Sequence, residues 1–203
     1  MCPTQCTSHI IELVIHLTQP ALAISRQTLD IIRCYGPCKH ILQVRLARGC
    51  ELAVFLQSGI SMHAAAVGPG NEAQIARGAG VRVAPDRRSV TIYLVESEAR
   101  ELLALVRANG AIAVALTKPK SHRTVQLKGE DARVVAVGHE DAVDVDRQVA
   151  AFDAELRSIG FPERFGWTLA GGSGLGLAAI AFTPSSAFLQ TPGPSAGTVL
   201  KKP

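Results

Sequence analysis

Residues 60–95 read ISMHAAAVGPGNEAQIARGAGVRVAPDRRSVTIYLV, and this stretch decides the fold. Its first part, Ile60–Val67, carries apolar residues at every second position, which is the period of a β-strand. The residues 68–71 form a turn, because glycine and asparagine tolerate positive φ and proline fixes its own φ. Ala73–Ala84 is expected as a second strand, and the turn at residues 85–88 leads to a third, Ser89–Val95. Three strands joined by tight turns predict an antiparallel meander.

The chain beyond this meander mixes helices and strands. Glu96–Ala108 has an apolar stripe at helical spacing, with Ser97 as its N-cap and Asn109-Gly110 as its end. The other expected elements are a helix over Glu51–Gln57, a strand over Ala111–Thr117, one long strand or two bent at Gly129 over Arg123–Val137, a helix over Asp141–Ile159, a short helix from Phe161, and a strand over Leu177–Thr183. About six strands with inserted helices predict an α+β fold whose sheet curls into a small barrel.

The organisation has three parts. Residues 1–49 are an N-terminal extension of unclear structure, residues 50–183 are the barrel domain, and residues 184–203, rich in Pro, Gly, Ser and Thr, are an extended C-terminal arm. Five cysteines all lie in the first 50 residues, and an odd count argues against a disulfide framework. No signal peptide and no membrane span are recognisable, so the expected location is cytoplasmic.

The composition excludes some classes of protein. Hydrophobic residues make up 47% and charged residues 19%, which is globular and far from disordered. A net charge of +4 permits a phosphate-bearing ligand but is too small for a dedicated nucleic-acid binder. Zinc spacings are not recognisable among the cysteines, so no metal site is predicted.

Several segments, in this order, carry a resemblance to a known family. They are QIARGAGVRV at residues 74–83, YLVES at 93–97, HRTVQLKG at 122–129 and QTPGPSAGT at 190–198. They stand in the order found in proteins similar to pyridoxamine 5'-phosphate oxidase, and the resemblance as a whole covers about three quarters of the chain. The resemblance implies a six-stranded antiparallel split β-barrel with flanking helices, as an obligate homodimer with flavin mononucleotide (FMN) bound across the interface.

The resemblance also implies which residues meet the cofactor. Arg77 and Arg82 stand where the family has basic residues that reach the flavin and its phosphate. Val95 and Ser97 stand at the strand-to-helix junction, and Thr124 and Gln126 on the strand that faces the ring; these six are the predicted cofactor-binding residues, and no catalytic residue is predicted. Related proteins oxidise or reduce small molecules, bind a deazaflavin, or handle haem, so the alternatives to FMN are a deazaflavin, haem or no cofactor.

The sequence departs from the family at one place. Well-studied oxidases begin the helix after the third strand with Ser-Arg-Lys, whereas this chain has Ser97-Glu98-Ala99. A phosphate dianion would be repelled by Glu98, so phosphate binding must rest on Arg77 and Arg82, with Lys118 or Lys120 as further candidates, or the cofactor is weakly held, different or absent. The first hypothesis is a flavin-dependent oxidoreductase acting on a small molecule; the alternatives are a non-catalytic flavin or haem binder and a cofactor-free dimeric barrel.

The spacing of the candidate residues raises one geometric question. Arg77 and Arg82 are five residues apart, so on a regular strand they would point to opposite faces. Gly78 and Gly80 lie between them and could supply a bulge that re-aims one side chain. Thr124 and Gln126 share a polar strand face, which is also what the solvent side of a sheet carries. For His63, among apolar neighbours, a structural or surface role is the simpler interpretation.

Overall fold

The computed structural model describes residues 49–200. The chain divides into two units, Met1–Lys39 and His40–Pro203, and every described residue belongs to the second. The cysteines at positions 2, 6, 34 and 38 and the helical stretches expected before residue 40 therefore lie outside the described residues.

One antiparallel sheet organises the described part of the chain. It has nine strands in the order β6-β7-β3-β2-β1-β4-β5-β8-β9 and is not closed on itself. The strands are β1 Ser61–Val67, β2 Ala73–Val83, β3 Val90–Val95, β4 Ile112–Thr117, β5 Thr124–Gly129, β6 Arg133–Val135, β7 Leu177–Phe182, β8 Ser186–Leu189 and β9 Thr198–Val199. The α+β class and the antiparallel sheet are confirmed, but the expected six-stranded split barrel is wrong, because nine strands form an open sheet with β6 and β9 at its edges.

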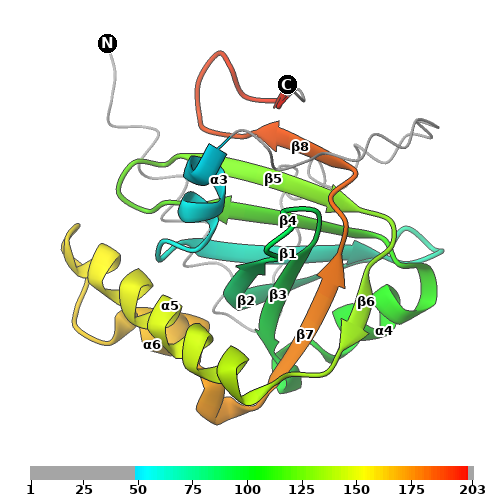
Figure 1. The fold of residues 1–203 in the computed structure, drawn as a ribbon, viewed down its shortest axis with the longest axis horizontal. Helices are drawn as coiled ribbons and strands as arrows, with labels where there is room; N and C mark the ends of the chain where they lie inside the picture. Colours follow the sequence, from blue (N-terminus) through cyan, green and yellow to red (C-terminus); the bar gives the residue numbers. More distant parts are fainter. Residues whose placement is uncertain (1–48, 201–203) are drawn as a thin grey trace. The chain divides into compact units, whose positions relative to one another are not determined.

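The predicted meander is present, and the chain after it extends the sheet on both sides. β7 joins the outside of β3, and β8 pairs with β5 through the register Gln126↔Phe188. The segment after Thr183, expected as an extended arm, thus contributes β8 and β9 to the sheet. Figure 1 shows β1, β4, β5 and β8 side by side, with β3, β7 and β6 crossing them at an angle.

The sheet curls around a single main core. Side chains from both halves of the sheet belong to one buried cluster, among them Val114 and Leu127 from β4 and β5 and Ile92 and Phe182 from β3 and β7. A Cβ added to Gly129 at the end of β5 would lie 2.5 Å from a ring carbon of Phe182, so the two halves meet closely there. The curled sheet buries apolar side chains on its inner face, and its other face is the outer face of the sheet.

β2 passes from one half of the sheet to the other. Its first half pairs with β1 and its second half with β3, and the register shifts between Gly78 and Gly80. Ala76 and Val81 both point into the main core although they are five residues apart. On a regular strand they would face opposite sides, so the extra residue of the bulge shifts the inward–outward alternation by one position. Because of it, Arg77 and Arg82 both lie on the outer face.

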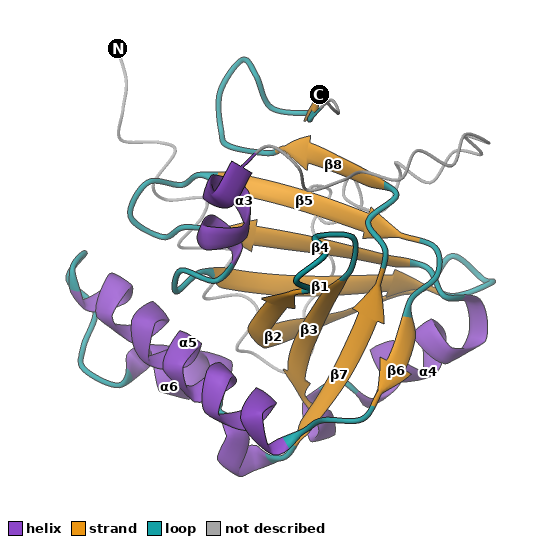
Figure 2. Cartoon of the chain, in the orientation of Figure 1, coloured by secondary structure: helices purple, strands orange, loops and turns teal. Residues whose placement is uncertain are grey.

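Helices cover selected parts of the sheet, as Figure 2 shows. They are α3 Gly49–Leu56, α4 Arg100–Asn109, α5 His139–Arg157 and α6 Phe165–Ala170, with single 3-10 turns η1 Glu96–Glu98 and η2 Ser173–Leu175. Residues of α5 and α6 form a second buried cluster with the outer face of β2, β3 and β7, which includes Tyr93 and Phe152. In contrast, no helix of the described residues forms such a cluster with the outer face of β1, β4 and β5.

The helix after β3 begins later than the sequence suggests. Glu96–Glu98 form the turn η1, and α4 starts at Arg100 with Ala99 in the N-cap position and no side-chain cap. The expected N-cap role of Ser97 is therefore wrong. At the other end, Gly110 adopts φ 68° and donates its N–H to the carbonyl of Val106, the left-handed C-cap that Asn109-Gly110 predicts.

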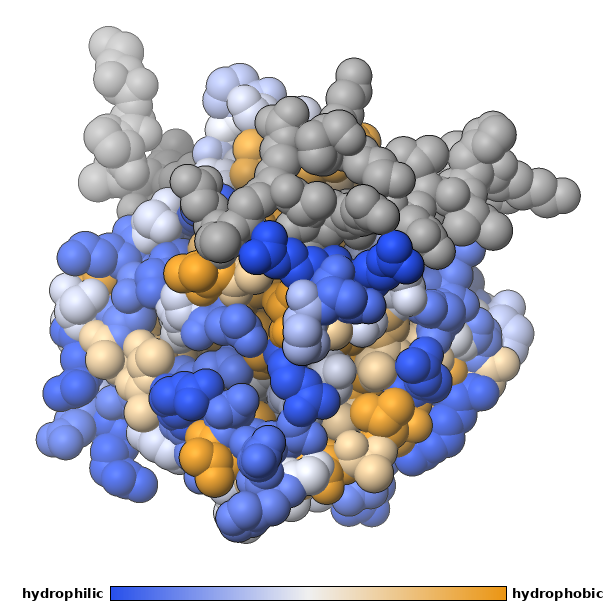
Figure 3. All heavy atoms as spheres, in the orientation of Figure 1, coloured by the Kyte–Doolittle hydropathy of each residue, from blue (hydrophilic) through white to orange (hydrophobic). Residues whose placement is uncertain are grey.

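The exposed hydrophobic side chains do not gather into a patch in the view of Figure 3, where they are separated by hydrophilic residues over the coloured surface. Large exposed examples come from different elements: Val54, Val143, Ile159, Leu175 and Val199. Within residues 49–200, no helix combines the length and the apolar character that crossing a bilayer requires.

Candidate functional site

A row of polar side chains runs across the outer face of β2, β1, β4 and β5. The strand registers place Arg77 opposite His63, His63 opposite Ala115, and Ala115 opposite Gln126. The sequence neighbours of these residues point into the core, so the row itself points outward. Arg77 and Gln126 are three strand spacings apart, about 14 Å at ~4.8 Å per strand. The structure therefore brings these two predicted residues onto one surface.

Small side chains make the surface beside this row flat. The next row along the strands is Ile75, Ala65, Ala113 and Lys128, in that order across the sheet. Ala65 and Ala113 in the middle of this row and Ala115 in the first are small, so the strands themselves leave room for a flat group on this face. In the structure Ala65, Ala113 and Gln126 are buried, at 7%, 3% and 5% exposure. A planar ring system could lie against these alanines with polar side chains at its edges.

Arg77 is the cation of the row. Its guanidinium donates a hydrogen bond to the Ser61 hydroxyl at 3.1 Å. Burial lowers the pKa of Arg77, and the charge of Glu98 acts in the opposite direction. A half-buried arginine that is held by one neutral hydroxyl and a nearby carboxylate is a suitable partner for an anionic group of a ligand.

His63 lies beside Arg77 on the neighbouring strand. Its Nε2 atom is buried and has no hydrogen-bond partner among the described residues. Burial, and then the charge of Arg77, lowers the pKa of His63 to about 3. The imidazole is thus neutral at physiological pH, with one ring nitrogen unsatisfied.

The segment Gln190–Thr191 borders the far end of the row. Gln190 donates from its side chain to Gln126 Oε1 at 3.2 Å, and its backbone N–H donates to the Thr124 carbonyl at 2.8 Å. Thr191 accepts from the backbone N–H of Thr124, whose own hydroxyl lies 3.1 Å from that of Thr117. Thr124 and Gln126 therefore sit on the same surface as Arg77, and the C-terminal segment positions them.

The junction after β3 lies next to the Arg77 end of the row. Ser97 and Glu98 are exposed and line a hollow of about 380 Å³ with Gln74, Ile75, Arg100, Glu101 and Leu102. Val95, in contrast, is buried at the end of β3, and a Cβ on Gly171 would contact its side chain. Ser97 is thus available to a ligand from the hollow, while Val95 could contribute only backbone groups.

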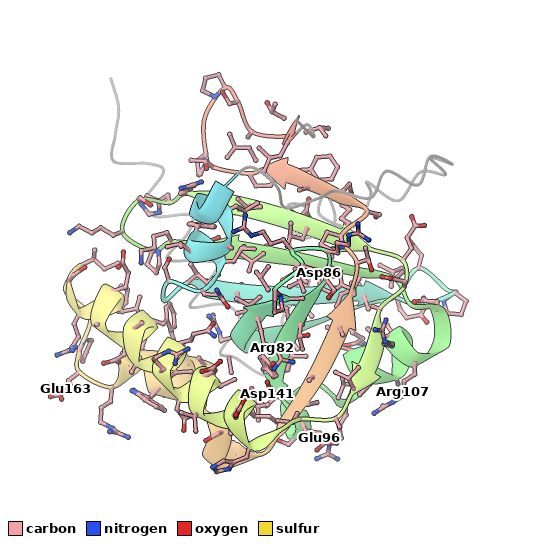
Figure 4. The ribbon with its side chains drawn as sticks, in the orientation of Figure 1. Arg82, Asp86, Glu96, Arg107, Asp141 and Glu163 are labelled. Atoms are coloured by element: carbon pink, nitrogen blue, oxygen red, sulfur yellow. The ribbon has the colours of Figure 1, made fainter. Side chains whose placement is uncertain are left out.

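The structure places Arg82 in a different environment. Its guanidinium pairs with Asp141 of α5 and lies 5.9 Å from the centre of the Tyr93 ring. Figure 4 shows Arg82 and Asp141 pointing toward one another. Asp141 also accepts from the Tyr93 hydroxyl at 2.7 Å and from the Gly138 N–H at 2.9 Å, so this cluster fixes α5 to the sheet.

The further cations suggested by the sequence have structural partners or face solvent. Lys118 donates to the Ser58 carbonyl at 2.6 Å and pairs with Glu155 at 3.1 Å, which ties the end of β4 to α5. Lys120 is exposed in the following turn. Across residues 49–200, no group of three or more His, Cys, Asp or Glu side chains could hold a metal ion.

Sequence reasoning missed the place of His63 in the row. The signal for it was present in the hairpin: the tight turn between β1 and β2 pairs Val67 with Ala73, and this register puts His63 opposite Arg77. The Asp141 cluster had no comparable signal, because α5 meets Arg82 and Tyr93 only in the folded chain.

Comparisons with known proteins give structural similarity only. No family model matches the chain. No curated protein matches it either. Solved structures similar to it include Group A Streptococcus HupZ (14% identity, TM-score 0.43, covering 72% of this chain and 97% of that one) and an F420 reductase (15% identity, TM-score 0.40, 66% and 92%).

A third similar structure is a protein of the pyridoxinephosphate oxidase family from Clostridium acetobutylicum, related to general stress protein 26 (10% identity, TM-score 0.38, covering 68% of this chain and 84% of that one). The neighbours thus include the family that the sequence resembles. At such identities and TM-scores they assign no ligand, reaction or partner to this chain.

Proposed function

We propose that this chain binds a flavin, as FMN, on the outer face of β2, β1, β4 and β5, and that it acts as an oxidoreductase on a small molecule. The observation that carries this proposal is the cross-strand row Arg77–His63–Ala115–Gln126. It combines a cation, a flat stretch and an amide on one surface, which are the features that a planar ligand with a phosphate tail requires.

The chemistry of each side chain supports a particular role. Arg77 would pair with the phosphate, since its planar fork can donate two parallel hydrogen bonds to phosphate oxygens. Gln126 and Thr124 would donate to or accept from the ring edge. The Gln126 side chain is already held by Gln190 and the Thr124 hydroxyl by Thr117, so little side-chain freedom would be lost on binding.

A flavin, when bound, supplies the hydride chemistry itself. The residues of the chain would then hold the ring flat against Ala65 and Ala113, exclude water from one side of it and pair its charge. We propose that the second side is closed by another copy of the chain, as a homodimer, because the row presents residues of the described chain to only one side of a ligand. Arg82 is left out of the site, since Asp141 already pairs with it.

The test begins with the purified full-length chain and its absorption spectrum, followed by titration with FMN monitored by flavin fluorescence. We expect binding, and we expect Arg77→Gln to weaken it at least about tenfold, the equivalent of ~1.4 kcal/mol. Arg107→Gln, an exposed arginine at the end of α4, is the matched control and should leave the affinity unchanged.

Three results would count against the proposal. A colourless protein that does not bind added FMN would favour the cofactor-free barrel, and a Soret band would favour a haem binder. If Arg77→Gln and wild type bind FMN with equal affinity, the phosphate does not bind at the Arg77 end of the row. If FMN binds, turnover with a nicotinamide donor and a small-molecule acceptor separates an oxidoreductase from a flavin carrier, and light scattering tests the dimer.

A further inference from the structure

The Arg77 end of the row contains a second nitrogen group that the proposed site does not yet use. His63 lies directly opposite Arg77 in the β1–β2 pair, where side chains of opposite residues are about 5 Å apart. Its Nε2 atom is buried and has no partner among residues 49–200. A buried polar atom left without a hydrogen bond costs about 1–3 kcal/mol, so this nitrogen would gain from a ligand atom.

The local charges define which ligand group would suit it. Arg77 faces His63 from β2, and Glu98 acts on Arg77 from η1. β4 presents the non-ionisable Ala115 opposite His63, and Lys128 of β5 lies one row further along the same face. With Arg77 so close, a cationic ligand group would be repelled, and an anion would be attracted.

The hollow beside Glu98 carries more acidic than basic side chains. Glu98 and Glu101 both line it, and Arg100 is the only basic residue among its lining residues. On the strand face itself, the residue directly opposite Arg77 is His63 of β1, which has a nitrogen without a partner in the described part of the chain.

We propose that His63 and Arg77 together form the phosphate subsite of the ligand, and that His63 takes up a proton from solvent when the phosphate binds. This inference rests on the proposed function and deepens it. In the bound state, protonated Nε2 would donate a hydrogen bond to a phosphate oxygen, and Arg77 would donate to another. No bond other than the N–H bond forms, and the complex gains one proton for each phosphate bound.

The free chain has the low proton affinity at His63 that such uptake requires. Burial, and then Arg77, lowers the pKa of His63 to about 3, so the imidazole is neutral before binding. A phosphate of charge about −2 beside it would raise its pKa, because an opposite charge favours the protonated form. Where the pH lies between the two pKa values, affinity must fall as the pH rises, by up to about tenfold per pH unit.

The pH window of the experiment is set by the ligand. The phosphate of FMN has its second pKa near ~6, so from about pH 7 upward the ligand is mainly a dianion and its own titration contributes little. We expect the FMN dissociation constant of wild type to rise about tenfold between pH 7 and pH 9. Riboflavin, which lacks the phosphate, should show no such rise.

The variants assign this pH dependence to one histidine. In His63→Gln the FMN dissociation constant should be higher than that of wild type at pH 7 and nearly constant up to pH 9. His122→Gln and His139→Gln are the controls: His122 also has a buried nitrogen without a described partner, and His139 is exposed at the start of α5. Both should keep the wild-type pH dependence.

A measurement on wild type alone keeps the test valid if His63→Gln does not fold. Calorimetry at pH 7 in two buffers of different ionisation enthalpy reports proton uptake, and we expect about one proton more for FMN than for riboflavin. Equal proton uptake for the two flavins, or unchanged pH dependence in His63→Gln, would overturn the role of His63 while leaving flavin binding intact. Failure of both FMN and riboflavin to bind would instead overturn the proposed function.

Discussion

Replacing Asp141 by asparagine tests the cluster that fixes α5 to the sheet. The Asp141 carboxylate is buried and accepts from Tyr93 at 2.7 Å, from the Gly138 N–H at 2.9 Å and from Arg82. An amide of the same shape has only one acceptor oxygen, so at least one donor loses its partner. We expect the free energy of unfolding to fall when this change is made.

The magnitude follows from the environment of each contact. A hydrogen bond to a charged group contributes about 1.5–3 kcal/mol. The Arg82 side chain is 47% exposed, so the ion pair itself adds at most about 1 kcal/mol. The expected loss for Asp141→Asn is therefore about 2–4 kcal/mol, or about 5–15 °C in Tm for a chain of this size.

The assay is urea denaturation of the full-length chain followed by circular dichroism at pH 7. Asp144→Asn is the matched control, because Asp144 lies one turn further along α5, its ion pair with Arg147 is solvent-exposed, and it acts on Tyr93 through its charge alone. Asp144→Asn should lower the free energy of unfolding by less than about 0.5 kcal/mol. Asp141→Asn with the stability of wild type to within this margin would refute the role of the cluster.

The pH dependence of the free energy of unfolding provides a second test of the same cluster. Burial alone would raise the pKa of Asp141, but the hydrogen bonds from Gly138 and Tyr93 and the charge of Arg82 together lower it. A carboxylate with a lowered pKa in the folded state contributes stability above its ordinary pKa of about 4, and the contribution is lost as the pH falls below that value. Between pH 5 and pH 3, Asp141→Asn should lose less stability than wild type.

Two further predictions concern packing and the ligand site. A Cβ on Gly166 of α6 would lie 2.6 Å from the Cα of Asp153 in α5, so Gly166→Ala should lower the free energy of unfolding by about 3 kcal/mol in urea denaturation. In Gly174→Ala nothing lies within 4 Å of the new Cβ, and a cost above ~0.5 kcal/mol there would show that the first effect is not steric. Glu98→Lys should tighten FMN binding about tenfold in fluorescence titration, because it replaces the carboxylate near Arg77 by a cation. Glu130→Lys, an exposed change outside that hollow, should have no such effect, and an equal gain in both variants would point to net charge alone.

Much of the candidate site follows from local sequence features. The turn at residues 68–71 sets the register of β1 on β2, and the alternation on β5 sends Val125 and Leu127 inward and Thr124 and Gln126 outward. The glycines of β2 indicate where a bulge can form, and the structure has the register shift there, between Gly78 and Gly80. These features are predictable because turn geometry and period-two alternation act over only a few residues.

The errors arose where distant segments meet. The pairing of β7 with β3 and of β8 with β5 enlarged the sheet and left it open. Ser97 could cap a helix that began at Glu98, but the chain forms a 3-10 turn over Glu96–Glu98 instead. Each of these outcomes depends on packing between residues far apart in the chain, which local propensity does not determine.

The sequence by itself determined the meander and the shared polar face of Thr124 and Gln126, and it offered Gly78 and Gly80 as the place of a bulge between Arg77 and Arg82. Only the tertiary structure decided that Asp141 of α5 pairs with Arg82, and that Gln190 reaches Gln126. The physical reason is that register and side-chain direction are fixed by neighbouring residues, whereas the partner of a charged side chain is fixed by which elements the buried core brings together.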